Sequence, residues 1–467
     1  MAATQGTQQD RVVVTWAAVA DAGVYAVYRS DSPQGPYTYS GQSSYTTYVD
    51  LAVGPQVHYW YKVTALSFRG DAESAPGGPV EGWSNHVYAW QPPSPVDAPA
   101  ARTELDADPA DGSVYALALA LVSDAQITVK RLGAANTWTA LGASFGSTSG
   151  FLIRPAAMTV VAGIPYVAYV DQSVGGRVTV QAFVGGQRRR LGSGSLGAAP
   201  VSEVEITAGD HALFVGAITA STDPASRLPQ VWRTALLLLP GAFGSSPADP
   251  SAATWSDISP ATIGPVSNLG IVPLGDALYA AFERNDGSAS ATLTALAAAT
   301  AGDLMTTPTW SSAVADLVTG DIISGYMDLA IDPTTQRLVV AYFVAGQQLF
   351  VRRGPAVLGN NWGSDLTQLL GLDASGQPVA APAVTAYATM DSVGLTVTQA
   401  GTLILFYRDA ASFSGVLQSL ASTTWQVLSP TALTGKTGLS SFSITTFENR
   451  IYLGYIEGNA AFMRAYQ

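Results

Sequence analysis

The feature that most constrains this chain is a strand–turn–strand pattern that recurs along its C-terminal four-fifths. Residues 158–169 read MTVVAGIPYVAY, where an apolar strand is followed by a tight Gly/Pro turn and a second, alternating strand. Related second strands return at 276–282, 336–342, 401–407 and 449–455. Self-similarity at a period of about 50 residues is typical of repeat arrays, most often β-propellers. We therefore expect a ring of similar sheets.

A large apolar residue in the second strand of each unit serves as an anchor for counting the units. The anchors are Tyr115, Tyr166, Phe214, Tyr279, Val339, Ile404 and Tyr452. Seven anchors predict a seven-bladed propeller. Most units also place a Trp further along, which we expect to pack between sheets; these are Trp138, Trp255, Trp310, Trp362 and Trp425.

The last unit ends soon after Tyr452, too early for a fourth strand. A ring that does not close leaves sheet edges exposed. We therefore expect residues 90–101 to supply the missing outer strand, and the alternative is a final sheet of three strands. The small residues Ala107, Ala157, Gly270, Ala330 and Gly394 are expected where the innermost strands crowd together.

Composition agrees with an all-β chain and excludes some classes of binding partner. The 467 residues include 46 Gly and 27 Pro, which suits many short strands joined by turns. The net charge of −12 excludes the basic surface that nucleic acids need, and the chain has no polybasic or long apolar stretch for membrane insertion. Cysteine is absent, so disulfides and thiolate chemistry are excluded. The Ala-rich run 295–301 is compatible with a short helix or a loop.

Residues 1–92 form a separate unit with short alternating strands at 11–16, 24–29 and 59–65, typical of a β-sandwich. The Val14-Thr-Trp16 strand, the 25–29 strand and the Tyr59-x-Tyr61 pair resemble a bacterial fibronectin type III domain. The resemblance implies a tyrosine corner after Leu51 and a closing strand at 84–89. It departs from the family at the Gly/Pro-rich stretch 75–79, which we interpret as a lengthened loop.

Residues 93–101 are a Pro-rich linker that we expect to space two domains semi-rigidly and to act as the closing strand. Residues 102–467 resemble the seven-bladed propellers of secreted bacterial proteins, with units that read approximately Tyr-Val-Ala-Tyr, a Gly-containing turn and Thr-Trp. That family includes lectins, adhesins, glycosidases and lyases, so the resemblance implies a fold and leaves the function open. It also implies an export signal or anchor in front of Met1.

A sialidase is the most natural enzyme to consider for such a ring. The chain keeps Thr-Trp at 137–138, 254–255, 309–310 and 424–425, but it lacks the Asp and Gly that precede them in Asp-box turns. Among the starts of the innermost strands only Arg154 is basic, so the arginine triad of sialidases is missing there.

Polar residues at the starts of the innermost strands are the candidate binding site at the mouth of the propeller. The candidates are Glu104, Arg154, Glu203, Asp328 and Asp391, with Asp106 and Glu205 beside them. Gathered at one mouth, they would hold a cation or a cluster of sugar hydroxyls. Two facing carboxylates would also suit glycoside hydrolysis. The structural alternative is a set of solvated strand ends around a water-filled channel.

Three other motifs receive mainly structural interpretations. Arg69-Gly70-Asp71 is an adhesive tripeptide in a loop of the sandwich, although ordinary loop sequence explains it as well. The turns 108–112 and 285–287 carry oxygen ligands, but they lack the spacing of a calcium loop. Arg188-Arg-Arg190 is expected to protect an outer sheet edge. We therefore expect no cofactor, with calcium an unsupported possibility.

These observations favour an exported, non-enzymatic binding or adhesion protein at the cell surface, in the periplasm or outside the cell. The propeller would be a rigid platform for a glycan or protein of the cell envelope, and the sandwich a spacer. The alternatives are a carbohydrate-active enzyme with carboxylates at the funnel, and a structural subunit of a surface assembly.

Overall fold

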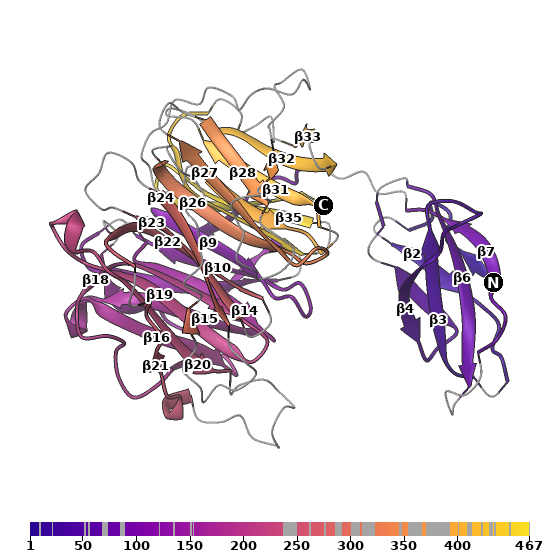
Figure 1. The fold of residues 1–467 in the computed structure, drawn as a ribbon, viewed down its shortest axis with the longest axis horizontal. Coiled ribbons are helices and arrows are strands. Elements are labelled where there is room, and N and C mark those ends of the chain that lie inside the picture. Colours follow the sequence, from indigo (N-terminus) through magenta and orange to yellow (C-terminus); the bar gives the residue numbers. More distant parts are fainter. Residues whose placement is uncertain are drawn as a thin grey trace. The chain divides into compact units, whose positions relative to one another are not determined.

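The computed structural model describes residues 1–8, 11–20, 22–50, 53–54, 57–67, 73–84, 89–120, 122–133, 136–149, 152, 154–236, 250–260, 263–274, 277–284, 292–299, 309–310, 323–344, 348–353, 367–369, 393–399, 401–408, 413–421, 424–428, 433, 436–447 and 450–466. Within these ranges the regular structure is β-strand, apart from the 3-10 turns η2 (Gln172–Val174), η3 (Pro224–Ser226) and η4 (Pro250–Ala252). The chain divides into two compact units, and the division falls after Gln91 (Figure 1). The predicted all-β fold, a fibronectin type III-like sandwich followed by a propeller, is confirmed.

The first unit is a sandwich of two antiparallel sheets. The three-stranded sheet has the order β1 (Ala2–Ala3), β2 (Val12–Thr15) and β5 (Thr47–Asp50). The four-stranded sheet has the order β4 (Thr38–Ser43), β3 (Ala22–Ser30), β6 (Tyr59–Ser67) and β7 (Gly77–Gly82).

Alternating residues of both sheets form the core of the sandwich, because successive side chains of a strand point to opposite faces. Val14, Val27 and Tyr61 are among its fully buried members. The Tyr61 hydroxyl donates to Asp50 Oδ2 at 3.0 Å, whereas the Tyr59 hydroxyl accepts from the Gly54 N–H at 3.1 Å. The expected contact between a tyrosine and nearby backbone is therefore made by Tyr59.

The stretch 75–79 was expected to be a loop, and this prediction is wrong. It runs into β7, which pairs with β6 at the edge of the four-stranded sheet. Pro79 is tolerated there because an edge strand has a free side that requires no N–H donor. Most of the expected closing strand at 84–89 lies outside the described residues.

The second unit consists of seven sheets, each named below by its innermost strand. The β9 sheet contains β9 (Arg102–Ala107), β10 (Val114–Leu119), β11 (Ala125–Leu132) and β12 (Trp138–Ala140), and β13 (Phe145–Thr148) also pairs with β11. The β14 sheet contains β14 (Ala156–Val161), β15 (Ile164–Asp171), β16 (Arg177–Val184) and β17 (Gln187–Arg190). The β18 sheet contains β18 (Val201–Ala208), β19 (Ala212–Thr219), β20 (Pro229–Ala235) and β21 (Ser256–Asp257).

The next three sheets repeat this order. The β22 sheet contains β22 (Val266–Leu274), β23 (Ala277–Arg284), β24 (Thr292–Ala299) and β25 (Thr309–Trp310). The β26 sheet contains β26 (Ile323–Asp332), β27 (Arg337–Val344), β28 (Gln348–Arg353) and β29 (Thr367–Leu369). The β30 sheet contains β30 (Val393–Val397), β31 (Leu403–Arg408), β32 (Phe413–Ala421) and β33 (Thr424–Val427).

The last sheet takes its outer strand from the other end of this unit. It contains β34 (Leu439–Phe447), β35 (Arg450–Glu457), β36 (Ala460–Tyr466) and β8 (Ser94–Asp97). β8 pairs antiparallel with β36, with Met463 opposite Ser94 and Ala461 opposite Asp97. An outer strand from residues 90–101 was predicted from the sequence, and the pairing supplies it.

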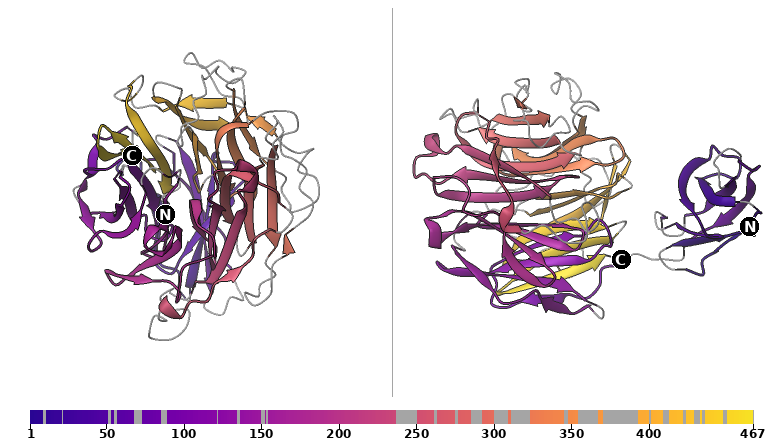
Figure 2. Two further views of the ribbon diagram at one scale, coloured as in Figure 1. Left: turned by 90° about the vertical axis from the view of Figure 1, so that its left-hand side faces the viewer. Right: turned by 90° about the horizontal axis from the view of Figure 1, so that it is seen from below.

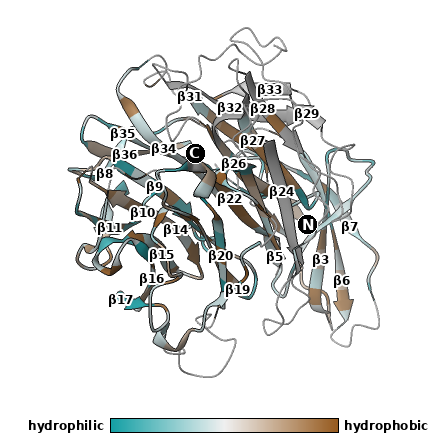
Figure 3. Cartoon of the chain, turned by 60° about the vertical axis from the view of Figure 1, so that its left-hand side comes forward, coloured by the Kyte–Doolittle hydropathy of each residue, from teal (hydrophilic) through white to brown (hydrophobic). Residues whose placement is uncertain are grey.

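The innermost strands contact one another in chain order, and β34 contacts β9, so the seven sheets close into a ring. In the right-hand view of Figure 2 the yellow C-terminal strands lie beside the purple strands that begin the ring. Figure 3 shows β9, β14 and β22 near the middle of this unit and β17 toward its outside.

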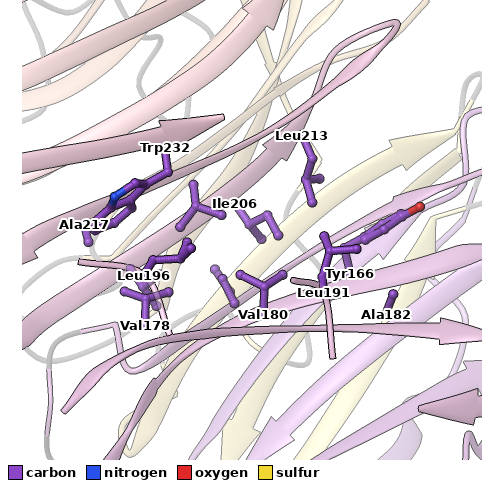
Figure 4. Packing of buried hydrophobic residues seen from close by; sticks show 14 of the residues in the cluster. Tyr166, Val178, Val180, Ala182, Leu191, Leu196, Ile206, Leu213, Ala217 and Trp232 are labelled. Atoms are coloured by element: carbon purple, nitrogen blue, oxygen red, sulfur yellow. The ribbon is translucent and has the colours of Figure 1, made fainter. Parts of the chain in front are cut away.

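Buried apolar side chains of neighbouring sheets form shared clusters. The brown, hydrophobic segments of Figure 3 lie along the strands. All seven anchor residues lie on the second strand of their sheet and are buried. Tyr166, Val180, Leu213 and Trp232, for example, pack between the β14 and β18 sheets (Figure 4). Crowding at the innermost strands is real: a Cβ on Gly394 would lie 2.0 Å from the Phe406 ring.

The tryptophans at the outer strands pack between sheets, as predicted, wherever the structure describes their side chains. Trp255 Nε1 donates to the Leu191 carbonyl of the preceding sheet at 3.2 Å, and Trp310 Nε1 donates to the Ile258 carbonyl. Trp138 packs against the cluster between the β34 and β9 sheets. Trp362 lies outside the described residues.

Two further sequence predictions concern single segments. The Ala-rich run 295–301 was expected to be a helix or a loop, but its first five residues belong to strand β24, because pairing with β23 and β25 overrides the helix preference of alanine. Arg188–Arg190 lie on β17, the outermost strand of the β14 sheet, as expected. In the described part of the chain, no helix is long and apolar enough to cross a membrane.

Candidate functional site

A cavity of about 260 Å³ lies at the centre of the ring, toward the end where the innermost strands begin. Its polar lining includes Arg102, Glu104, Arg154, Glu205, Asp328 and Ser441. Its apolar lining includes Leu117, Leu119, Phe406 and Phe442. Strands from six sheets contribute to this lining, so the cavity exists only when the ring is closed.

The carboxylates at the centre of the ring accept hydrogen bonds from the backbone of the following sheet. Glu104 Oε1 accepts from the Met158 N–H at 3.1 Å, and Asp106 Oδ2 accepts from the Val160 N–H at 2.8 Å. Two side chains that are two residues apart on β9 therefore accept from two N–H groups that are two residues apart on β14. This spacing matches the alternation of side chains along a strand. Such bonds satisfy backbone donors along the free edge of an innermost strand.

The same arrangement recurs at other junctions of the ring. Glu205 Oε2 accepts from the Ile271 N–H at 3.0 Å, and Asp328 Oδ2 accepts from the Leu395 N–H at 2.8 Å. Because these bonds fix the carboxylates in place, the charged groups that line the cavity are held in position before any ligand arrives.

Arg154 is the basic centre of the site. Its guanidinium pairs with Glu205, and its Nη1 lies 3.6 Å from Glu203 Oε1. Glu203 is 1% exposed, and neither of its carboxylate oxygens has a hydrogen-bond partner among the described residues. Arg102, the second basic residue of the lining, donates from Nη2 to the Leu152 carbonyl at 2.8 Å.

Burial makes these acids weaker than they are in water. It raises the pKa of Glu104 to about 7, although the Met158 N–H and the charge of Arg154 act in the opposite direction. Burial likewise raises the pKa values of Asp106 and Glu203 to about 7, and it raises the pKa of Asp328. Removal from water is the largest cause in all four cases.

The structure brings together three of the predicted site residues, since Glu104, Arg154 and Asp328 line one cavity. Glu203 is not among the lining residues, but its Oε1 lies 3.6 Å from Arg154 Nη1. Asp391 and the tripeptide Arg69-Gly70-Asp71 lie outside the described residues.

The sequence interpretation missed Arg102, Ser441 and the two phenylalanines of the lining. Ser441 had a detectable signal, because it stands two residues before Ser443 on β34 just as Glu104 stands two before Asp106 on β9. The Ser441 and Ser443 hydroxyls accept from the N–H groups of Thr103 and Leu105 at 2.9 and 3.0 Å. Phe406 and Phe442 gave no signal, since an apolar residue on a strand normally belongs to the core.

The structure gives no support to a metal centre in the part of the chain that it describes. No group of three or more acidic or histidine side chains lies close enough together there to hold a metal ion. The Asp108 carboxylate accepts from the backbone N–H groups of Ala110 and Gly163, which explains its turn without calcium. Residues 285–287 lie outside the described part.

Comparisons with known proteins support the fold. No protein-family model and no curated protein matches the sequence. Among solved structures, the BP39L lectin from Burkholderia pseudomallei is 14% identical, covers 78% of this chain and 94% of its own, and has a TM-score of 0.51.

Two further solved structures have lower TM-scores. A GH43_1 enzyme from Xanthomonas citri is 14% identical over 80% of this chain and 90% of its own, with a TM-score of 0.34. An Fn3-like protein from Clostridium thermocellum is 26% identical over 18% of this chain and 88% of its own, with a TM-score of 0.17. The strand pairing and the likeness to the lectin together show an all-β chain with a β-propeller fold.

Proposed function

We propose that this protein is a non-enzymatic carbohydrate-binding protein whose propeller takes one sugar residue of a glycan in the central cavity. The observation that carries the proposal is the mixed lining of that cavity. Carboxylate and guanidinium groups come from Glu104, Asp328 and Arg154, whereas Phe406 and Phe442 contribute apolar surface.

A sugar presents both kinds of surface, hydroxyl groups at its edge and C–H groups on its faces. Ordered carboxylates accept hydrogen bonds from hydroxyls, and a guanidinium donates to ring or hydroxyl oxygens. The cavity volume of about 260 Å³ lies just below the range of about 300–1,000 Å³ that is usual for drug-sized ligands. One sugar residue, with the rest of the glycan outside, suits this size.

The remaining features of the proposal come from the domain organisation. The sandwich is a separate compact unit ahead of the ring, which suits a spacer. We place the protein outside the cytoplasm, in the periplasm or at the cell surface, with a glycan of the cell envelope as its partner. The likeness to a lectin supports the fold alone and is compatible with this function.

A glycan array probed with the full chain tests the proposal, followed by calorimetry with the best ligand. We expect Asp328→Asn to weaken binding at least tenfold, because it removes a charged acceptor from the cavity. Asp111→Asn is the matched control, since Asp111 is an exposed residue whose carboxylate lies 3.8 Å from Arg131. An array without any bound glycan, or a ligand that both variants bind equally well, would contradict the proposal.

A glycoside hydrolase is the second candidate, and one observation favours it. Glu104 and Asp328 line the same cavity, and the pKa of Glu104 is raised to about 7, as a general acid requires. Both residues, however, already have a role in joining neighbouring sheets. The test is whether the protein releases reducing ends from the bound glycan. If it does, and Glu104→Gln abolishes this release, the function is hydrolysis and not binding alone.

A structural subunit of a surface assembly is the third possibility. Light scattering separates it from the other two. A strict monomer that binds a glycan contradicts this role, whereas an ordered assembly without glycan affinity supports it.

A further inference from the structure

The cavity holds more negative than positive groups, and the negative groups come from alternate sheets of the ring. Glu104, Glu205 and Asp328 lie on β9, β18 and β26 and line the cavity together with Arg102 and Arg154. Asp106 stands two residues from Glu104, and its charge raises the pKa of Glu104. Among the described residues, these four carboxyl groups thus lie close to two guanidinium groups.

The positive charge of Arg154 is shared among most of these acids. The guanidinium contacts Glu205 and lies within ion-pair distance of Glu203. Its charge also opposes the rise that burial causes in the pKa values of Glu104 and Asp328. Glu203 is buried without a hydrogen bond among the described residues. A buried carboxylate without sufficient compensation is costly, so a further positive charge would stabilise the cluster.

Glu104 offers the contact point for such a charge. Its Oε1 accepts from the Met158 N–H, whereas its Oε2 has no hydrogen-bond partner among the described residues. The side chain is partly exposed and lines the cavity, and the charge of Asp328 acts on it. A donor in the cavity therefore meets two carboxylates whose positions are fixed by bonds to the following sheets.

We propose that the sugar taken by this cavity is an amino sugar, whose protonated amino group donates to Glu104 Oε2 and to Asp328. This inference rests on the proposed carbohydrate-binding function and adds the chemical class of the ligand. An ammonium group has three N–H donors, which suits acceptors on different strands, and its charge offsets the excess of carboxylates.

The test compares three forms of each sugar at pH 7 with the full chain. The probes are glucosamine, galactosamine and mannosamine, their parent hexoses and their N-acetyl derivatives, measured by calorimetry and ligand-observed NMR. We expect at least one amine to bind tenfold or more tightly than its parent sugar and its N-acetyl form. Raising NaCl from 50 to 500 mM weakens the binding of the amine and leaves the neutral sugars unchanged.

Glu104→Gln is the decisive variant, because its amide oxygen can still accept from the Met158 N–H while the charge is lost. We expect the affinity for the amine to fall to within twofold of that for the parent sugar, with an unchanged near-UV circular dichroism spectrum. Glu457→Gln is the matched control, since Glu457 is an exposed partner of Lys436 on the same ring, and it keeps the preference.

The remaining outcomes distinguish a failure of the amino-sugar assignment from a failure of the proposed carbohydrate-binding function. Equal binding of amine and parent sugar, or a preference for the N-acetyl form, overturns the inference and leaves the carbohydrate-binding function intact. If none of these probes binds while the glycan array yields another ligand, the amino-sugar assignment alone is wrong. If the array is silent as well, both the assignment and the proposed function are wrong.

Discussion

Two junctions of the ring use different side chains to accept hydrogen bonds from the backbone of the next innermost strand. Between the β9 and β14 sheets, Glu104 and Asp106 accept from the backbone of the following innermost strand, at 3.1 and 2.8 Å. Between the β34 and β9 sheets, where the ring closes, Ser441 and Ser443 do the same at 2.9 and 3.0 Å. The geometry of the two junctions matches, but only the first can change its charge.

The closing junction also differs from the β14/β18 and β18/β22 junctions at the outer strands. Trp255 and Trp310 each donate to a carbonyl of the preceding sheet. At the closing junction, Trp138 Nε1 has no partner among the described residues. There Lys130 Nζ donates to the Val96 carbonyl at 2.7 Å and lies 3.1 Å from Asp97 Oδ1. At the closing junction β8, a strand from outside the repeat, therefore contacts both the β34 sheet, through β36, and Lys130 of the β9 sheet.

The largest effect is expected from removing β8. A chain that starts at Pro92 retains this strand, whereas a chain that starts at Pro99 lacks it. We expect the shorter chain to lose about 5 kcal/mol of unfolding free energy, from the buried Val96 side chain and the hydrogen bonds to β36. Urea unfolding measures the difference. If the two chains are equally stable, β8 contributes nothing to closure.

A smaller effect is expected from pH, and it separates the two junctions. The folded-state pKa values of Glu104 and Asp106 are raised to about 7, above the values of about 4 for unfolded chains. Between pH 4 and 7 the unfolded chain loses these protons while the folded chain keeps them. Their contribution to stability is therefore fully present below about pH 4 and is lost as pH rises to about 7.

Asp106→Asn tests this pH dependence. We expect the fall in unfolding free energy between pH 5 and pH 8, on the order of 3 kcal/mol from these coupled acids, to become clearly smaller in this variant. Ser443→Ala at the closing junction should lower stability by about 1–2 kcal/mol at both pH values, because it removes an acceptor from the Leu105 N–H. An unchanged pH dependence in Asp106→Asn would show that the carboxylate is not the titrating group.

The smallest effects distinguish the tryptophans. Trp255→Phe removes the donor that bonds the Leu191 carbonyl, so we expect a loss of about 1–2 kcal/mol. Trp138→Phe removes an N–H without a hydrogen bond in the described structure, and we expect a change within about 0.5 kcal/mol. Thermal unfolding followed by calorimetry compares the pair. Equal losses would mean that packing alone, and not the hydrogen bond, determines both.

Much of the fold was predictable because strands carry a period-two pattern that the ring repeats. Tyr166 and Tyr452 reveal second strands by local alternation, and the short final unit revealed the need for β8. Strand β24 and the edge strand β7 were missed because their sequences carry helix-like or turn-like residues, and pairing with neighbouring strands decided their conformation.

The candidate site was only partly predictable. The sequence identified Glu104, Arg154 and Asp328 as polar starts of innermost strands, but it did not show that a single guanidinium would be shared among several acids. Phe406 and Phe442 were indistinguishable from core residues until the ring placed them at the cavity.

The sequence by itself determined the number of units and the class of each unit, because these follow from alternation and turn chemistry. It favoured residues 90–101 as the source of the closing strand, and the pairing of β8 with β36 decided this point. Only the tertiary structure decided which side chains face one another across the centre of the ring. That choice depends on the register of seven sheets, since Glu104, Arg154 and Asp328 are far apart in the chain. Burial within the closed ring, and no property of the separate residues, raises the pKa of Glu104 to about 7.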